Sequence, residues 1–176
     1  MPIHYRFPQT LIEVTPDNRS RWRENHLKSL AFNYGRAPFL DHYLPALTEC
    51  LNQDHRTLAD LNTAVVELLS GWLDIRCRVV RSSTLSVNGA STERLVNLCK
   101  TLKADTYLSG SGGKGYLEEP LFKEAGIALE YQEFHHPVHR QVAFKNVPEF
   151  IPCLAAVDLL FNCGPDHSPQ ILRQMP

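Results

Sequence analysis

The sequence lacks several features that would assign it to a large class of proteins. It contains no signal peptide and no apolar run of about 20 residues, the length that a helix needs to cross a bilayer. The formal net charge of −1 provides no basic field that would attract nucleic acid or an anionic membrane. Internal repeats, blocks of like charge and low-complexity segments are also missing. We therefore expect no membrane span and no nucleic-acid partner.

The five cysteines include no Cys-x-x-Cys pair. They are odd in number and widely spaced, which argues against a disulfide framework or a zinc site. We expect reduced, mostly buried thiols and a cytoplasmic location. With 43% hydrophobic and 21% charged residues over 176 positions, the chain can bury a core and fold as a single globular domain.

Periodicity predicts an α/β fold whose first part is helical. Apolar residues recur at helical spacing over 18–34, 39–51 and 57–73, and Asn18 or Ser20 could cap the first helix. Strand-like runs then alternate with helical segments, with the strands expected at 74–80, 106–108 and 127–132. This alternation is typical of a small, mostly parallel sheet with crossover helices, here preceded by a helical hairpin. A last helix is predicted from Pro152 to Gly164.

The stretch "TYLSGSGGKGYLEEPLF" holds a glycine-rich loop after a predicted strand. Closely spaced glycines let successive backbone amides point at an anion, and Lys114 would add a positive charge. The loop is not a Walker A motif, because Leu108 replaces its first glycine and Gly115 replaces its Ser or Thr. It is not a nucleophile elbow around Ser111 either, since Ser109 replaces the first glycine of that motif. The remaining alternatives are a ligand-facing loop and a mobile surface turn.

Asp158 lies on the apolar stripe of the last predicted helix, within "PCLAAVDLLFNC". A carboxylate on a buried face is costly unless it is paired or hydrogen-bonded. Its candidate partners are Arg81, Lys114 and the amides of the glycine loop, and Asn162 one turn later could serve the same polar pocket. Asp158 could therefore be a structural ion-pair residue or part of a catalytic site.

Histidines occur in two places that could carry chemistry. The stretch "FHHPVHRQ" contains His135, His136 and His139, but its proline excludes a helical pair and no thiol or carboxylate completes a metal-ligand set. We expect these imidazoles to line a rim as acid–base groups and not to hold a metal. His26 and Asn33 share the apolar stripe of the first helix, where they either satisfy buried partners or face a pocket.

Five stretches, in this order, resemble the WbqC-like protein family: "WRENHLKSLAFNYGRAPFLDHY", "RSSTLSVNG", "RLVNLCKTLKADTYLSGSGGKGYL", "GIALEYQEF" and "FIPCLAAVDLLFNCGP". The similarity covers nearly all of the chain from Trp22 to Pro165. Members of that family are typically bacterial and often associated with gene clusters for O-antigen or other surface polysaccharides. For some, transfer of an aminoacyl or acyl group to an amino sugar has been suggested.

The positions that match the family pattern are Trp22, His26, Asn33, Tyr34, Ala37, Pro38, Arg81, Ser82, Tyr107, Ser109, Gly110, Gly113, Tyr116, Asp158, Asn162 and Gly164. Family members usually open with a strand and a Gln-Pro, aromatic-rich turn, which this chain lacks. The resemblance thus implies a single WbqC-like domain over 1–176, shortened at its N-terminus. Apolar surface left open there predicts association into homo-oligomers or poor solubility.

The resemblance and the residues together favour a transferase that acts on a nucleotide-linked amino sugar without a metal or cofactor. His26 or His136 would accept a proton from the attacking amine, and Asp158 would orient a substrate. The predicted ligand-binding residues are Arg81, Ser109, Gly110, Gly112, Gly113, Lys114, Tyr116, Asn33 and Asn162. The alternatives are a non-catalytic ligand-binding or accessory protein and, with least support, a metal-dependent hydrolase.

Overall fold

The computed structural model describes residues 1–142 and 150–174. The chain divides into two compact units: unit 1 comprises Met1–Cys77 and His136–Pro176, and unit 2 comprises Arg78–His135. The fold is mixed α/β, as predicted, whereas the single domain over 1–176 stays a prediction.

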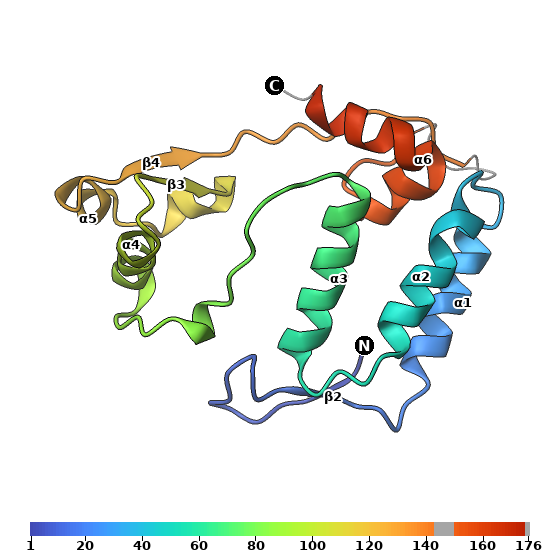
Figure 1. The fold of residues 1–176 in the computed structure, drawn as a ribbon, viewed down its shortest axis with the longest axis horizontal. Helices are drawn as coiled ribbons and strands as arrows, with labels where there is room; N and C mark the ends of the chain where they lie inside the picture. The colour runs from blue at the N-terminus through green and yellow to red at the C-terminus, as the bar shows by residue number, and fades with distance from the viewer. Residues whose placement is uncertain (143–149, 175–176) are drawn as a thin grey trace. The chain divides into compact units, whose positions relative to one another are not determined.

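Unit 1 is built from four helices: α1 (Trp22–Tyr34), α2 (Leu40–Asn52), α3 (Leu58–Trp72) and α6 (Ala156–Arg173). In Figure 1, α2 lies between α1 and α3, and α6 packs against α2 and α3. The helical spacing of apolar residues produces this arrangement, because one face of each helix enters a common core. The most deeply buried of these core side chains are Tyr43, Leu160 and Phe161. The predicted helical hairpin is confirmed.

Capping explains the start of α3 but not that of α1. The Thr57 side chain accepts a hydrogen bond from the Asp60 amide at 3.1 Å, and the Asp60 carboxylate accepts one from the Thr57 amide at 3.2 Å. The predicted cap of α1 is wrong, because no side chain caps that helix. Instead, Asn18 accepts a hydrogen bond from Arg23 and Ser20 donates one to a backbone carbonyl.

The last helix differs from its prediction at both ends. It begins at Ala156 and not near Pro152, since Cys153 has a φ of 62°, outside the helical region. At Gly164, with a φ of 77°, the helix kinks and continues to Arg173. A Cβ atom at Gly164 would lie 2.6 Å from the Phe39 ring, so only glycine fits this kink.

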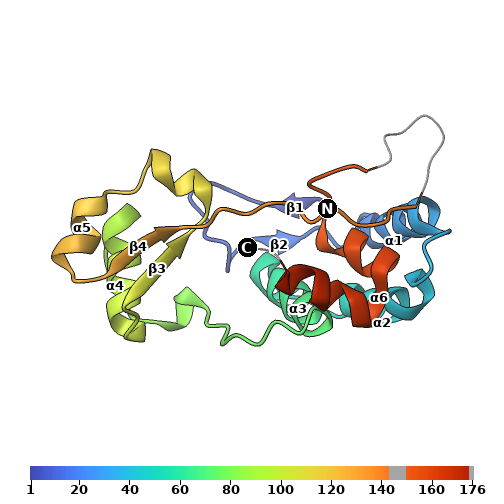
Figure 2. The same ribbon diagram turned by 90° about the horizontal axis from the view of Figure 1, so that it is seen from above.

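Unit 2 contains a parallel strand pair, β3 (Thr106–Ser109) and β4 (Ala128–Tyr131), with registers running from Thr106↔Ala128 to Ser109↔Tyr131. Its helices are α4 (Ser91–Leu102) and α5 (Glu119–Glu124), with short 3₁₀ turns η1 (Ser82–Thr84) and η2 (Ser111–Gly115). Figure 2 shows the two strands side by side, and α5 connects them along the chain. Val96, Phe122 and Ile127 form the centre of its apolar cluster. The parallel sheet with a crossover helix is confirmed.

The strand predicted over 74–80 is wrong. Residues 75–80 carry no regular structure, and Ile75 and Val79 are nearly half exposed. Alternating apolar and charged side chains fit a strand only when a neighbouring strand pairs with it, and no described segment pairs here. Near the N-terminus, pairing is limited to two residues in each of β1 (Ile3–His4) and β2 (Thr15–Pro16).

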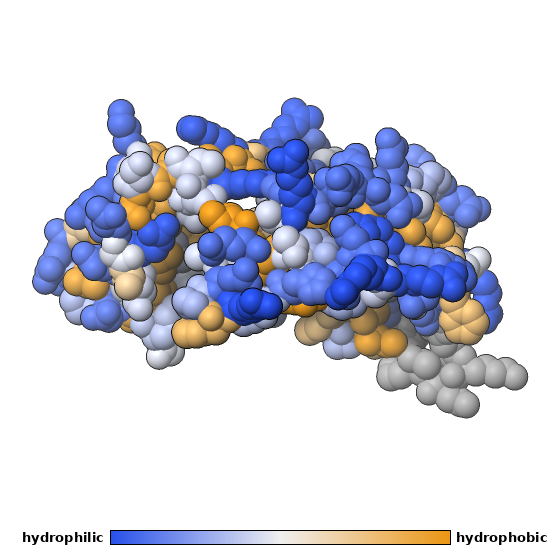
Figure 3. All heavy atoms as spheres, turned by 90° about the horizontal axis from the view of Figure 1, so that it is seen from below, coloured by the Kyte–Doolittle hydropathy of each residue, from blue (hydrophilic) through white to orange (hydrophobic). Residues whose placement is uncertain are grey.

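Apolar side chains remain exposed on several surfaces. Near the N-terminus they are Ile3, Tyr5, Phe7, Leu11 and Ile12. Figure 3 shows one face of the molecule, on which apolar side chains are interspersed with hydrophilic ones. No helix within the described residues is both long and apolar enough to span a membrane. All five cysteines are free; Cys50 and Cys99 are buried, while Cys77 and Cys153 are exposed, contrary to the expectation of mostly buried thiols.

Candidate functional site

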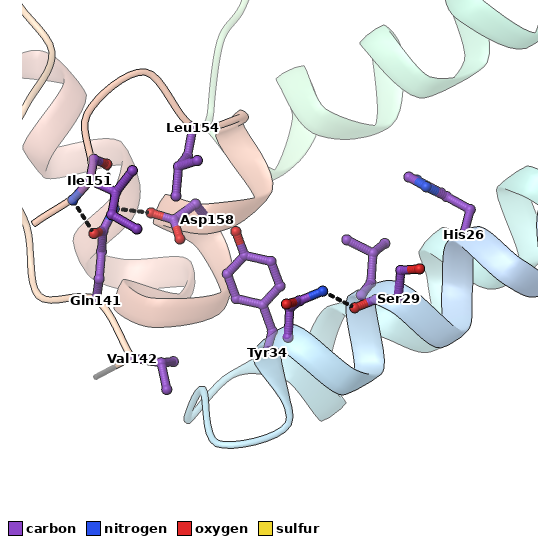
Figure 4. A pocket seen from close by; sticks show the side chains of 10 residues that line it. His26, Ser29, Tyr34, Gln141, Val142, Ile151, Leu154 and Asp158 are labelled. Atoms are coloured by element: carbon purple, nitrogen blue, oxygen red, sulfur yellow. Dashed lines mark hydrogen bonds between the residues drawn. The ribbon is translucent and has the colours of Figure 1, made fainter. Parts of the chain in front are cut away.

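A pocket of about 500 Å³ opens in unit 1 between α1 and two later segments, 141–142 and 151–158 (Figure 4). Its size is that of a small-molecule site. The lining residues are His26, Ser29, Leu30, Asn33, Tyr34, Gln141, Val142, Ile151, Leu154 and Asp158. One part of the wall is therefore aliphatic, and the polar groups come from α1 and from the region around Asp158.

The α1 wall follows from helical spacing. Ser29 and Leu30 follow His26 by three and four residues, and Asn33 and Tyr34 follow Leu30 by three and four, which places all five along one face. The Ser29 hydroxyl donates to the Asn25 carbonyl at 2.9 Å, and the Asn33 amide donates to the Ser29 carbonyl at 2.8 Å. His26 is exposed and lies about two helical turns before Tyr34 (Figure 4). It is the only histidine among the described residues that line the pocket.

Asp158 accepts several side-chain hydrogen bonds, and it is only 3% exposed. Its Oδ2 lies 2.8 Å from His139 Nε2 and accepts a hydrogen bond from Gln141 Nε2 at 2.7 Å. Asn162 Nδ2 lies 3.2 Å from the other oxygen, Oδ1, and 2.8 Å from the Asp158 carbonyl. These donors give a buried carboxylate the hydrogen bonds that it needs.

These contacts correct the expected partners of Asp158. Arg81, Lys114 and the glycine-loop amides all belong to unit 2. The carboxylate is satisfied instead by neutral amides and an imidazole from within unit 1. Only the expected contribution of Asn162 is confirmed.

His139 links Asp158 to the backbone carbonyl of Pro137. Its side chain is 1% exposed, and its Nδ1 lies 3.1 Å from the Pro137 oxygen. Each ring nitrogen of His139 therefore lies within hydrogen-bond distance of an oxygen, which fixes the orientation of the imidazole. The Phe150 ring packs edge-on against the imidazole, with 5.4 Å between the ring centroids. His139 and Asp158 are thus a buried pair at the centre of the polar cluster.

Tyr34 presents a phenol that stays protonated. Burial raises its pKa well above the usual value of 10.0, and the charge of Asp158 and a hydrogen bond to that residue raise it further. Figure 4 shows the hydroxyl pointing toward the Asp158 carboxylate. The Tyr34 ring is held by an edge-on contact with Phe161, at a centroid distance of 5.2 Å. Tyr34 is therefore a fixed hydrogen-bond donor at neutral pH.

Gln141 joins two segments that border the pocket. Its Nε2 donates to the Ile151 carbonyl at 2.9 Å, and its Oε1 accepts from the Ile151 amide at 2.7 Å. The same Nε2 reaches Asp158. One side chain thus fixes both the aliphatic wall at Ile151 and the carboxylate.

The glycine loop belongs to unit 2 and folds as the 3₁₀ turn η2 after β3. Gly113 is buried, and a Cβ atom there would lie 2.1 Å from Ser109 Oγ, so packing alone requires this glycine. At Gly110, Gly112 and Gly115 a Cβ atom would meet nothing within 4 Å. No residue of 109–116 has a positive φ, so the loop does not adopt the alternating conformation of an anion nest.

The predicted site residues fall into both units. His26, Asn33 and Asp158 line the pocket, and Asn162 holds Asp158. His136 lies near this cluster, with its ring centroid 6.3 Å from that of His139. Unit 2 contains Arg81, Ser109, Gly110, Gly112, Gly113, Lys114 and Tyr116. No group of three or more His, Cys, Asp or Glu residues in the described chain is placed to hold a metal ion.

Three residues of the cluster were not selected from the sequence as site residues. Tyr34 shares the helical face of His26 and Leu30, and this spacing could have placed it in the pocket. His139 was noted only as a member of a histidine group. Gln141 gives no local signal, because its role depends on Ile151 and Asp158, which are distant in the chain.

Comparison with known proteins places the chain in a family. The sequence pattern of the WbqC-like protein family matches residues 1–169. The chain is also similar to the uncharacterized protein Rv1507c of Mycobacterium tuberculosis, with 30% identity over 173 residues, which cover 97% of this chain and 71% of that protein. No solved structure matches the chain significantly. The chain belongs to the WbqC-like protein family.

Proposed function

We propose that this protein transfers an acyl or aminoacyl group to the amine of a nucleotide-linked amino sugar during bacterial surface-polysaccharide (O-antigen) biosynthesis in the cytoplasm. The observation that carries the proposal is the pocket of unit 1, which combines an aliphatic wall with a fixed polar cluster. The aliphatic side chains of Leu30, Ile151 and Leu154 suit an acyl group. The polar groups around Asp158 suit the hydroxyls or the amide of a sugar or aminoacyl group.

The proposed reaction is a direct attack within a ternary complex. The sugar amine attacks the acyl carbonyl carbon, the bond from that carbon to the leaving group breaks, and the amine releases a proton. His26 is the proposed base, because it lines the pocket and its side chain is exposed, so that a substrate in the pocket could reach it. His136 is the second candidate. Asp158 is proposed to position Tyr34 and the substrate, since its oxygens already accept several hydrogen bonds.

Unit 2 is proposed to bind a phosphate or carboxylate of a substrate through the Ser109–Gly113 amides with Lys114 and Arg81. The open space over Gly110 and Gly112 supports this proposal, because an anion could approach the backbone there. Lys114 is exposed, with its ammonium 5.4 Å from the centre of the Tyr131 ring. Lys114→Ala is expected to raise KM for a phosphate-bearing substrate with little effect on kcat.

A transfer assay tests the proposal. The protein is incubated with nucleotide-linked amino sugars and acyl or aminoacyl thioesters, and mass spectrometry detects the N-acylated product. His26→Ala should lower kcat by roughly 10²- to 10⁴-fold, as expected for loss of a general base. His167→Ala, which removes an exposed histidine outside the pocket, should not. Equal rates for His26→Ala and wild type would refute the assignment of the base.

A non-catalytic ligand-binding protein is the second candidate. It is favoured by the hydrogen bonds that already engage Asp158 and its neighbours, because such groups are less available for proton transfer. A substrate that binds in the pocket but is never converted would support this reading over the transferase.

A further inference from the structure

A second hollow of about 370 Å³ adjoins the main pocket within unit 1. It is lined by Arg36, Pro38, Arg140, Gln141, Val142 and Asn162. Gln141 and Val142 line both hollows, so the two are neighbours along the same short segment. A ligand that fills the main pocket could therefore extend into the second hollow.

The second hollow contains two guanidinium groups without an acidic partner among residues 1–142 and 150–174. Arg36 and Arg140 form no ion pair or hydrogen bond with any of those residues. Some exposed arginines of unit 1 are paired, as Arg21 is with Glu24 and Arg76 with Asp74, whereas Arg6 and Arg56 are unpaired among the described residues but lie outside both hollows. Two such guanidiniums facing one hollow create a positive potential in a chain whose overall charge is −1.

The main pocket, unlike the second hollow, carries no lysine or arginine among its described lining residues. It contains the carboxylate of Asp158 and several aliphatic side chains. A phosphate placed there would meet a negative charge and an apolar wall. The charge difference between the hollows therefore assigns the neutral part of a ligand to the main pocket and the anionic part to the second hollow.

We propose that Arg36 and Arg140 bind a phosphate or diphosphate group of the small molecule that occupies the main pocket. Guanidinium groups suit this role, since they bind phosphate oxygens through paired N–H donors. The identity of that molecule rests on the proposed function, in which a nucleotide-linked sugar and a coenzyme A thioester both carry a diphosphate. The site differs from the phosphate site proposed at the glycine loop, which belongs to unit 2.

Binding of inorganic pyrophosphate to the whole chain tests this site. Titration is followed by NMR of the arginine Nε–H signals, with those of Arg36 and Arg140 assigned from the single Lys variants. We expect both signals to shift and the double variant Arg36→Gln/Arg140→Gln to bind pyrophosphate roughly ten- to a hundred-fold more weakly. Arg56→Gln, which removes one exposed guanidinium outside both hollows, should bind like wild type.

Two results would overturn the site: no pyrophosphate binding by wild type, or unchanged affinity in the double variant. Binding that is lost in Lys114→Ala but kept in the double variant would place the anion at the glycine loop and also overturn it. Uridine diphosphate and coenzyme A, titrated separately, distinguish the nucleotide-sugar from the thioester as the source of the phosphate. If pyrophosphate binding depends on Arg36 and Arg140 but no acyl transfer is detected, the anion site is supported and the proposed transferase function is refuted.

Discussion

The Asp158 carboxylate is hydrogen-bonded by side chains from two separate segments of the chain. His139 and Gln141 precede the last helix, and Asn162 lies on it, one turn after Asp158. Because the carboxylate is buried, each donor compensates for water that the group has lost. At the scale of single residues, the candidate site is therefore a cluster in which removal of one charge leaves several polar groups unsatisfied.

We predict that Asp158→Ala lowers the free energy of unfolding by about 3–5 kcal/mol, because it leaves the buried His139 and Gln141 without their acceptor. Urea unfolding at neutral pH measures the change. The matched variant Asp54→Ala, which removes an exposed carboxylate, should cost no more than about 0.5 kcal/mol. Equal losses in the two variants would mean that the cluster contributes no net stability.

Tyr34 gives a prediction at high pH. Burial, followed by the charge of Asp158 and the hydrogen bond to it, raises the pKa of Tyr34 in the folded state above the value of 10.0 expected in the unfolded chain. The folded state thus holds this proton more tightly, so its contribution to stability is complete below pH 10 and is lost as the pH rises from there through the folded-state pKa. Tyr34→Phe removes this contribution.

The free energy of unfolding at pH 9 and pH 11 should therefore fall less in Tyr34→Phe than in wild type. Tyr116→Phe is the control, because Tyr116 is 71% exposed. It should show the wild-type fall between the two pH values. A Tyr34→Phe protein that loses as much stability as wild type over this interval would show that the Tyr34 phenol ionises equally readily in both states.

At the scale of helices and strands, the kink of α6 depends on one glycine. Gly164 has a φ of 77°, and a Cβ atom there would lie 2.6 Å from the Phe39 ring. We predict that Gly164→Ala destabilises the protein by about 1–3 kcal/mol, from backbone strain and overpacking. Gly71→Ala in α3 is the matched change, since nothing lies within 4 Å of its Cβ position.

Gly71→Ala should be neutral or stabilising by up to about 1 kcal/mol, because alanine is the better helix former. Thermal and urea unfolding of both variants compare the two sites. If the two substitutions change stability by the same amount, the close contact between Gly164 and Phe39 does not constrain the helix.

The elements that sequence could predict are those whose signal is local. Helical periodicity and Thr57 mark α3, and the apolar alternation of β4 marks a strand. The segment 74–80 shows the limit, because alternation indicates a strand only if another strand pairs with it. In the site, His26, Asn33 and Asp158 were predictable from polar residues on apolar stripes. Gln141 was not, since its partners come from distant residues.

At the scale of the whole molecule, the two compact units divide the proposed chemistry. Unit 1 carries the pocket with its polar cluster, and unit 2 carries the glycine loop. Self-association stays a prediction, supported by exposed apolar side chains such as Phe7 and Leu11. The claim on which the proposed function depends is that the pocket of unit 1 binds a small molecule.

The most direct test compares the thermal unfolding midpoint of wild type and Ser29→Trp with nucleotide-sugars and acyl thioesters. Ser29 is an exposed pocket residue whose hydroxyl bonds only within its own helix, so tryptophan should fill the pocket without unfolding the chain. Asn25→Trp, at an exposed position of α1 outside the pocket, is the control. A ligand at about 100 times its dissociation constant should stabilise wild type and Asn25→Trp by roughly 2.7 kcal/mol and leave Ser29→Trp unchanged. Equal stabilisation of all three proteins would contradict a ligand site in this pocket.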